Sequence, residues 1–287
     1  MLRHFSKKKI KILVVYHKKY ELPNKNEVYV PIHAGRKIAD YNYENNRITK
    51  QEYDWLNKNL VGDNTGDNIS ELNSQINEMT AIYWAWKNYD KLDNPDYIGL
   101  YHYRRYLDIN IKDLQNIFNT YYYAQVEQLQ VEPGRTLYEQ WHEECANWAD
   151  NQYLDNALDA CKNFDKDLGK NIEMFFKQQT KVSWCNMFIL PKEEFFKYCE
   201  FIFPLLFYLL DTLPKREDRA LGMFAERLTA YYLYRLSISR LSYSTTRITP
   251  AISTTFLQNI FSITNINNHK QILILGLKIK IKIQKKR

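Results

Sequence analysis

A cluster of basic and aromatic side chains follows a short apolar segment in the first half of the sequence. Residues 97–101 form the apolar segment, and His102, Arg104 and Arg105 come directly after it. A proline before the segment and a glycine inside it predict a strand that is entered from a turn. Open α/β sheets bind ligands at the carboxyl ends of their strands, and guanidinium groups bind phosphate oxygens in pairs. The spacing therefore predicts an anion site at this strand end.

Two earlier segments end in the same way. Residues 10–16 are rich in β-branched side chains and predict a first buried strand, which His17 follows at once. Residues 28–33 predict a second short strand, and Arg36 stands in the turn after it. Side chains at such strand ends are either ligand contacts or solvated ends of the strand, and the sequence leaves both open for His17.

The segment from Asp63 to Ser70 is dense in Asp, Asn and Gly, a composition that predicts a turn or loop. Asp63 and Asp67 stand four residues apart, and each is followed by an asparagine, Asn64 or Asn68. Such a pattern is compatible with a hard cation, although an EF-hand would place its ligands at alternate positions. A structured turn that leads into the next helix is the other interpretation.

Several predicted elements carry further candidate side chains. A helix is predicted over residues 71–89 from apolar side chains spaced three and four apart, and Tyr83 lies among them. A second helix is predicted over residues 138–161, where His142 is either a base or part of a solvated face. Further helices are predicted over residues 111–123 and 193–210, and Pro204 is expected to kink or divide the second.

Two charged side chains interrupt an otherwise apolar helix that is predicted over residues 216–235. They are Glu226 and Arg227, and burying such a pair is costly unless both groups are satisfied. That cost makes the pair a candidate for a functional site. Residues 184–190 predict a further apolar strand, which contains Asn186.

Composition indicates a globular protein with an unusual tail. The chain has 287 residues, 45% hydrophobic and 25% charged, with no repeats or Gly/Ser linkers, so one domain is expected. The formal net charge is +7, and residues 268–287 alone hold seven Lys and Arg and no acid. The body is therefore neutral, which argues against nucleic acid as a partner. The tail is expected either to bind anionic lipid or to be a frayed basic end.

The four cysteines include no CxxC pair, and this argues against a zinc site. No run reaches the length of a membrane span, and the first residues do not form a signal peptide. A cytoplasmic protein with reduced cysteines is expected.

The combined motifs resemble a known family. They are Asp63 to Ser70, Glu78 to Asn88, Tyr97 to Tyr106, Asn186 to Ile189 and Ala225 to Leu228. Together they are similar to bacterial capsular and exopolysaccharide synthesis proteins, long catalogued as a domain of unknown function and grouped with glycosyltransferases. The resemblance covers about residues 10 to 250. It implies a GT-A-like α/β fold, with a mixed sheet flanked by helices. The expected domains are a glycosyltransferase domain over residues 1–255 and a basic amphipathic tail over 256–287, and the tail is not part of the resemblance.

The resemblance also implies an activity and its site. A sugar would pass from a nucleotide-sugar donor to a growing capsular, exopolysaccharide or lipopolysaccharide glycan, at the inner face of the cytoplasmic membrane. Glu226 is the first choice for the catalytic base and Asp67 the second, and Arg104 and Arg105 would neutralise the departing diphosphate. The expected donor contacts are His17, Arg36, Asp63, Asn64, Asn68, Tyr83, His102, Arg104, Arg105 and Asn186. His142 and Arg227 are expected on the acceptor side.

One departure from the family pattern concerns metal. Most GT-A enzymes end the corresponding strand in Asp-x-Asp, which holds a divalent cation, whereas this sequence reads His102-Tyr103-Arg104. The expectation is that fixed cations replace the metal; if Mn or Mg is bound, Asp63 and Asp67 are its predicted ligands. A non-catalytic glycan-binding or scaffold protein is the alternative function. A nucleotidyl or phosphosugar transferase is disfavoured because no glycine-rich phosphate loop is present.

Overall fold

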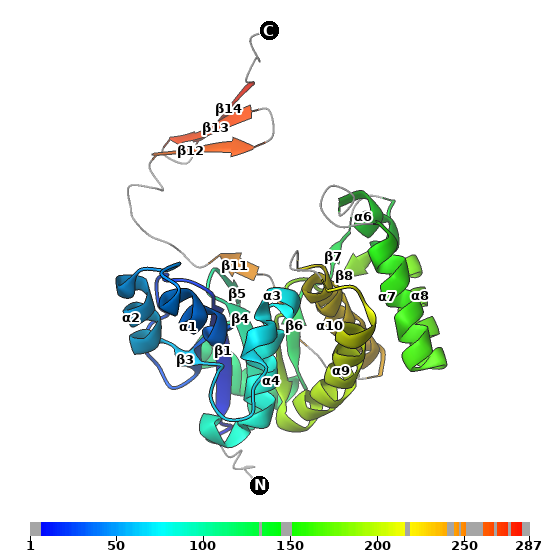
Figure 1. Cartoon of the computed structure of the whole chain (residues 1–287), viewed down its shortest axis with the longest axis horizontal. Helices are drawn as coiled ribbons and strands as arrows, with labels where there is room; N and C mark the ends of the chain where they lie inside the picture. The colour runs from blue at the N-terminus through cyan, green and yellow to red at the C-terminus, as the bar shows by residue number, and fades with distance from the viewer. Residues whose placement is uncertain are drawn as a thin grey trace. The chain divides into compact units, whose positions relative to one another are not determined.

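The computed structural model describes most of the chain. The described residues are 7–131, 134–144, 151–215, 219–239, 244–246, 248–250, 261–266, 269–274 and 277–282. The chain divides into two compact units, residues 1–249 and 250–287 (Figure 1). The boundary predicted at residue 255 lies outside the described residues.

The larger unit is built on one mixed sheet with the strand order β10-β6-β9-β4-β1-β2-β3, and β5 pairs with β4 and β11. Its strands are β1 Ile10–Tyr16, β2 Tyr29–His33, β3 Val61–Gly62, β4 Tyr97–His102, β5 Arg105–Leu107, β6 Ala124–Val126, β9 Phe188–Pro191, β10 Ser244–Thr246 and β11 Ile248–Pro250. A separate two-stranded ladder joins β7 Leu129–Gln130 to β8 Lys181–Val182. The predicted fold class, a mixed sheet flanked by helices, is confirmed.

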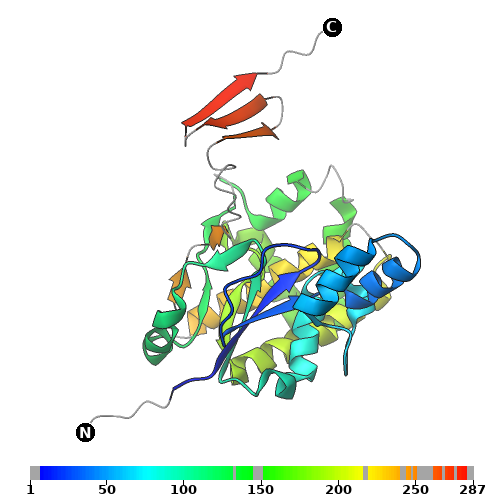
Figure 2. The same ribbon diagram turned by 90° about the vertical axis from the view of Figure 1, so that its left-hand side faces the viewer.

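The centre of the sheet brings several strand ends together. β1 pairs in parallel with β2 on one side and β4 on the other, and β2 pairs in parallel with β3 (Figure 2). The register aligns Val15 with His102 and Tyr16 with His33. The carboxyl ends of these strands therefore meet at one edge. In an open α/β sheet, the place where parallel strands continue on both sides of a first strand is where a binding crevice forms.

Helices cover both faces of the sheet. They are α1 Arg36–Glu44, α2 Lys50–Asn59, α3 Asn73–Ile76, α4 Met79–Lys87, α5 Leu114–Thr120, α6 Leu137–Glu144, α7 Asn151–Phe164, α8 Lys166–Gln178, α9 Lys192–Thr212 and α10 Ala220–Ser239. Short 3₁₀ helices are η1 Ser70–Leu72, η2 Tyr89–Leu92 and η3 Ile111–Asp113. In Figure 1, α4, α9 and α10 lie together on the near side of the sheet.

Buried apolar side chains form two clusters, one on each face of the sheet, and alternate side chains of β1 belong to different clusters. Leu13 and Val15 pack with side chains from α4, α9 and α10, whereas Ile12 and Val14 pack with side chains from α1, α2 and α5. Successive side chains of a strand point to opposite faces, so a strand buried on both sides reads as a continuous apolar run. This is the pattern that predicted the strand from sequence.

The helix predicted over residues 71–89 is divided in two. Asn77 has a φ of 53°, a left-handed conformation that a right-handed helix does not tolerate, and it separates α3 from α4. Gly222 of α10 packs closely against Asn77, because an added Cβ at Gly222 would lie 2.1 Å from the Asn77 amide nitrogen. The break thus follows from long-range packing, which the helical periodicity does not report.

Other predicted helices are close to those observed. The helix predicted over residues 111–123 corresponds to η3 and α5. The helix predicted over residues 138–161 corresponds to α6 and α7, which lie on either side of residues 145–150, outside the described part. α9 is not divided at Pro204, where a kink or a division was predicted; Pro204 is exposed, so water can satisfy the carbonyl that lacks its N–H partner. The helices α1, α2 and α8 were not predicted.

The smaller unit contains three strands, β12 Phe261–Ile266, β13 His269–Ile274 and β14 Leu277–Lys282. They form an antiparallel sheet in the order β12-β13-β14. In the described part of the basic tail, residues 277–282 form a strand in which apolar side chains alternate with lysines.

Candidate functional site

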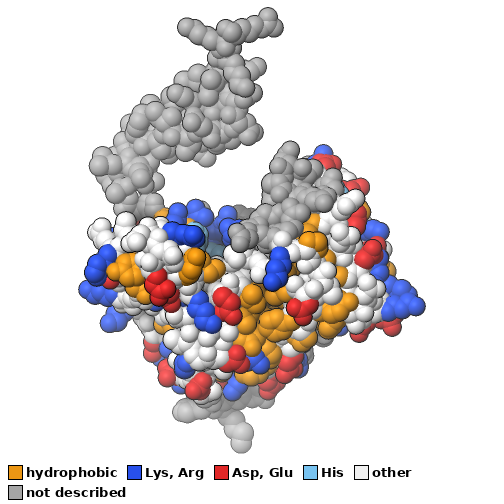
Figure 3. Space-filling view, viewed as in Figure 1, with side chains coloured by type: hydrophobic (Ala, Val, Ile, Leu, Met, Phe, Trp, Pro, Cys, Tyr) orange, Lys and Arg blue, Asp and Glu red, His pale blue; other side chains and the backbone are white. Residues whose placement is uncertain are grey.

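A cleft of about 1010 Å³ opens at the carboxyl ends of the central strands. Its lining comprises Val15, His17, Ala34, Asn73, Ser74, Asn77, Glu78, His102, Tyr103, Arg104, Arg105, Val131, Gln140, Trp184, Cys185, Arg219, Met223, Glu226 and Arg227. In Figure 3, several Lys and Arg side chains gather at the upper edge of the larger unit, beside a patch of His. The cleft therefore lies at the edge that the strand ends predict.

One wall of the cleft comes from a tight hairpin at the end of β4. His102 pairs with Arg105, so Tyr103 and Arg104 form a two-residue turn between β4 and β5. The Tyr103 ring is buried and stacks on Tyr16 at 5.4 Å between ring centroids. The Arg104 guanidinium lies over the same ring at 5.0 Å. A buried aromatic anchor thus holds the hairpin, while both arginines remain exposed at the cleft.

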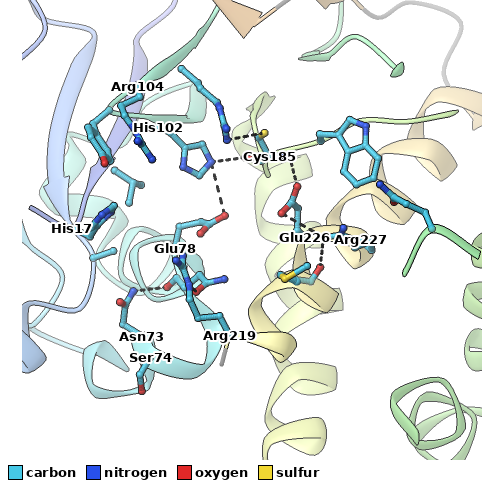
Figure 4. Close-up of a pocket in the computed structure, with 18 of the residues that line it drawn as sticks. His17, Asn73, Ser74, Glu78, His102, Arg104, Cys185, Arg219, Glu226 and Arg227 are labelled. Carbon is cyan, nitrogen blue, oxygen red and sulfur yellow. Dashed lines mark hydrogen bonds and ion pairs between the residues drawn. The ribbon is translucent and has the colours of Figure 1, made fainter. Parts of the chain in front are cut away.

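The opposite wall comes from α10. Glu226 and Arg227 are neighbours on this helix, and their side chains approach to 3.7 Å between Oε2 and Nη1. Glu226 is partly exposed to the cleft, whereas Arg227 is only 6% exposed. Figure 4 shows Glu226 on the side of the cleft opposite His17, His102 and Arg104. The charged pair that interrupts the apolar helix is thus placed at the site.

A strained turn before β9 connects the two walls. Cys185 and Asn186 have φ values of 74° and 52°, and two successive left-handed residues other than glycine are uncommon. The Cys185 N–H donates to Glu226 Oε1 at 2.6 Å, and the Cys185 carbonyl lies 2.6 Å from His102 Nε2. Because a carbonyl only accepts, Nε2 of His102 carries the proton in this contact. One peptide segment therefore fixes the carboxylate and the imidazole relative to each other.

Glu78 is a second carboxylate in the cleft, and the sequence did not single it out as a site residue. It stands at the break between α3 and α4, where its Oε1 accepts from Asn186 Nδ2 at 2.8 Å. The same oxygen lies 3.9 Å from His102 Nε2. The only sequence signal was its position at the start of the Glu78 to Asn88 motif. Arg219, whose Nε donates to Asn77 Oδ1 at 2.6 Å, was also missed as a lining residue.

Local environment sets the charge of two further groups. Desolvation, together with Lys18, Arg219 and Arg104, lowers the pKa of His17 to about 4, so this imidazole is neutral at pH 7. Burial, with a smaller contribution from the Glu226 carboxylate, raises the pKa of the Cys185 thiol to about 11. At neutral pH, His17 therefore adds no positive charge to the cleft.

Asp63 lies outside the cleft lining and is fully buried. Its carboxylate accepts the backbone N–H groups of Gly35 and Arg36 at 2.8 and 2.9 Å, the Thr80 hydroxyl at 2.7 Å, and the Ser70 hydroxyl. Each of the two carboxylate oxygens thus accepts two hydrogen bonds within the fold. Asp63 fastens the end of β3 to α1, η1 and α4, which leaves it no place for the predicted donor or metal.

Removing this carboxylate is expected to destabilise the fold strongly. Asp63→Ala should lower the free energy of unfolding by at least about 3 kcal/mol, because it leaves buried donors unpaired. Urea denaturation monitored by circular dichroism measures the change. Asp67→Ala is the matched control, since Asp67 is exposed and accepts one hydrogen bond, from Tyr83 Oη at 3.1 Å. Equal destabilisation by the two variants would contradict this role of Asp63.

The structure places the other predicted contacts outside the lining as well. Arg36 is buried, with Nε on His33 Nδ1 at 2.7 Å and Nη2 on the Leu56 carbonyl at 2.9 Å. The burial of His33 itself, together with the nearby Arg36 charge, lowers the pKa of His33 to about 3. Arg36 therefore ties α1 to α2.

The remaining side chains of the Asp/Asn-rich loop make local contacts. Asn64 Nδ2 donates to Asp40 Oδ2 at 2.9 Å, and Asn68 Nδ2 donates to the Gly66 carbonyl at 2.8 Å. This matches the structured-turn interpretation of the loop. Asn186 is buried behind the cleft, and its contact with Glu78 makes it a neighbour of the lining.

Two further predicted residues lie elsewhere. Tyr83 packs edge-on against Phe203 at 5.1 Å, on the side of α4 that faces α9. The His142 ring is tilted against that of Tyr138 in α6, with 4.4 Å between the ring centroids, and His142 does not line the cleft. Of the predicted site residues, the structure brings together His17, His102, Arg104, Arg105, Glu226 and Arg227.

The residues present do not form an evident cation site. Across the described part of the chain, no three His, Cys, Asp or Glu side chains are grouped so as to hold a metal ion. At the two positions where an Asp-x-Asp would supply carboxylates, His102 contacts the Cys185 carbonyl and Arg104 contributes a positive charge. The reaction proposed below therefore includes no step that involves a metal ion.

Among the described residues, no helix is both long and apolar enough to cross a bilayer.

Comparisons with known proteins gave two matches. A family model described as "Domain of unknown function (DUF4422)" matches residues 11–237. The apo structure of WbbM, a protein titled a bifunctional glycosyltransferase, superimposes with a TM-score of 0.66 at 23% sequence identity. The match covers 85% of this chain and 46% of the WbbM chain, so this chain spans about half of that protein. A search of curated proteins found no match. At this identity the likeness establishes a shared fold.

Proposed function

This chain belongs to the DUF4422 family, and we propose that it is a glycosyltransferase that moves a sugar from a nucleotide-sugar donor to a growing glycan. The observation that carries the proposal is the cleft, in which two exposed arginines on a fixed hairpin face a carboxylate on α10. An inverting transfer from a nucleotide sugar is assisted by a cation at the leaving group and by a base at the acceptor hydroxyl, on opposite sides of the reacting carbon. The fold shared with a glycosyltransferase supports the proposal.

The arginines would act on the leaving group. When the bond between the anomeric carbon and the diphosphate oxygen breaks, the nucleoside diphosphate gains negative charge. Arg104 and Arg105 offer planar, permanently charged donors that suit phosphate oxygens. Their hairpin is held by the buried Tyr103 ring, so little reorganisation is needed as that charge develops. This is the role that a divalent cation has in other glycosyltransferases.

Glu226 would act on the nucleophile. A hydroxyl of the acceptor attacks the anomeric carbon, the new C–O bond forms, and the hydroxyl proton passes to the Glu226 carboxylate. The Cys185 N–H holds Oε1 of this carboxylate at 2.6 Å. Oε2, which lies 3.7 Å from Arg227 Nη1, would take the acceptor proton. His102 holds the other end of the same turn through the Cys185 carbonyl. Arg227 would stand on the acceptor side, next to this base.

Binding followed by transfer tests the function. The wild-type protein is screened by thermal shift against UDP-, GDP- and dTDP-linked sugars, because a ligand that binds only the folded state raises the melting temperature. Any donor that binds is then incubated with glycan acceptors, and the product is identified by mass spectrometry. Binding of no donor, or binding without transfer or hydrolysis, would reject the enzyme and favour a glycan-binding protein.

We further propose that the acceptor is a capsular, exopolysaccharide or lipopolysaccharide glycan and that the basic C-terminal segment holds the protein on an anionic membrane surface. The segment carries seven Lys and Arg, each contributing about 1 kcal/mol near an anionic lipid surface. The full-length protein should sediment with vesicles that contain phosphatidylglycerol and be released by 1 M salt. Equal binding to neutral phosphatidylcholine vesicles would contradict the electrostatic mode.

A further inference from the structure

The end of the cleft that holds Arg227 also contains an aromatic and an amide side chain. Beyond Glu226 the lining consists of Trp184, Gln140, Val131 and Arg227. In Figure 4, Glu226 and Arg227 lie on the side of the cleft opposite His17, His102 and Arg104. This aromatic end, which we define as Trp184, Gln140 and Arg227, differs chemically from the arginine hairpin.

The aromatic end is built around a stacked guanidinium. The Arg227 Cζ atom lies 5.1 Å from the ring centroid of Trp184 and 5.2 Å from that of Trp141. Its Nη1 donates to the Met223 carbonyl at 3.1 Å within α10. The guanidinium is therefore buried between two indoles, and it fixes the orientation of Trp184. Trp184 itself is only partly buried and presents a flat apolar surface to the cleft.

Two polar atoms at this end lack partners. Gln140 is 7% exposed and lines the cleft, yet its Oε1 accepts no hydrogen bond within the described part of the chain. The buried Nε of Arg227 likewise donates no hydrogen bond there. Buried polar atoms are normally paired, so an unpaired acceptor on a side chain that lines the cleft indicates a ligand that donates to it. A hydroxyl group both donates and accepts.

We propose that the aromatic end binds a neutral sugar ring of the acceptor glycan. A sugar ring presents a face of C–H groups, which suits the indole of Trp184, and a rim of hydroxyls, which suits Gln140 Oε1. The assignment of this sugar to the acceptor rests on the proposed function. It follows from the place of Arg227, which lies on the Glu226 side of the cleft and opposite Arg104. We expect a sugar without a charged group, because Arg227, the cation at this end, is buried behind the Trp184 indole and does not offer its charge to the cleft.

Equilibrium binding of simple sugars tests the subsite without requiring a reaction. Methyl glycosides of glucose, galactose, mannose and rhamnose are titrated by saturation-transfer NMR against the full-length protein, with and without UDP. Trp184→Ala is expected to raise the Kd of the best glycoside at least about tenfold, and Trp184→Phe to have a smaller effect because a ring remains. Gln140→Leu, which keeps the volume, should also weaken binding severalfold.

Trp86→Ala is the matched control. Trp86 is a partly buried tryptophan that stacks on Phe203 at 5.6 Å and lies outside the cleft lining. Glycoside binding that is lost in Trp184→Ala and retained in Trp86→Ala supports the subsite. Unchanged binding in Trp184→Ala, equal loss in both variants, or no glycoside binding by the wild type would each overturn it. Loss restricted to Trp184→Ala in a protein that transfers no sugar would reject the transferase and keep the glycan site.

Discussion

Arg104→Ala and Arg105→Ala are each expected to lower kcat for sugar transfer about 100- to 1,000-fold. Removing a preorganised donor from the position where charge develops has an effect of this size in other enzymes. Both side chains are exposed, so the melting temperature should change little. Steady-state kinetics with the donor that the thermal-shift screen identifies, together with thermal melting of each variant, measure the two effects.

Arg47→Ala provides a matched control for this experiment. Arg47 is also exposed and also lies over a tyrosine ring, that of Tyr41 at 5.3 Å, but it is outside the cleft. Its removal should leave kcat unchanged. Near-normal turnover in both cleft variants would refute the phosphate role. Complete loss of wild-type transfer in excess chelator, restored by manganese, would show that a metal, and not the arginine pair, neutralises the leaving group.

Glu226→Gln is expected to lower kcat about 100- to 10,000-fold while leaving donor binding intact. The amide keeps the shape of the side chain, and its oxygen can still accept the Cys185 N–H. What it loses is the ability to take the acceptor proton, and general base catalysis contributes this range of rate. Single-turnover transfer measures the loss, and the donor-induced thermal shift reports binding separately.

Glu78→Gln distinguishes the two carboxylates of the cleft. Glu78 accepts from Asn186 and faces His102, so its amide variant should perturb the turn and lower kcat far less than Glu226→Gln. A larger loss in Glu78→Gln than in Glu226→Gln would move the base to Glu78. Rescue of Glu226→Ala, which leaves space for a small anion, by added azide or formate would further support the assignment to Glu226.

Local sequence pattern predicted the elements whose signal is strong. The apolar run of β1 and the glycine-containing β4 were placed correctly because strands buried on both faces have continuous apolar sequence. The helices α1 and α2 were missed; α2, for example, buries only Leu56 among its ten residues. A weak apolar periodicity carries little information about a helix whose stability comes from contacts such as those of Arg36.

Two further features were decided by contacts between distant segments. The division between α3 and α4 at Asn77 depends on the close packing of Gly222, which is far along the chain. The loop acids looked like ligands by composition, yet Asp63 is fully occupied by groups from α1, η1 and α4. Composition reports which groups are available, whereas only the fold determines which partners use them.

By itself, the sequence determined that a strand ends in His102, Arg104 and Arg105, and that an apolar helix carries Glu226 and Arg227. Those statements depend on residues close in the chain, where side-chain periodicity is fixed by backbone geometry. The tertiary structure decided that these groups share one cleft. It did so through the left-handed turn at Cys185, which joins a histidine 83 residues before it to a glutamate 41 residues after it. Such juxtaposition arises from strand order and packing across the sheet, which no local pattern encodes.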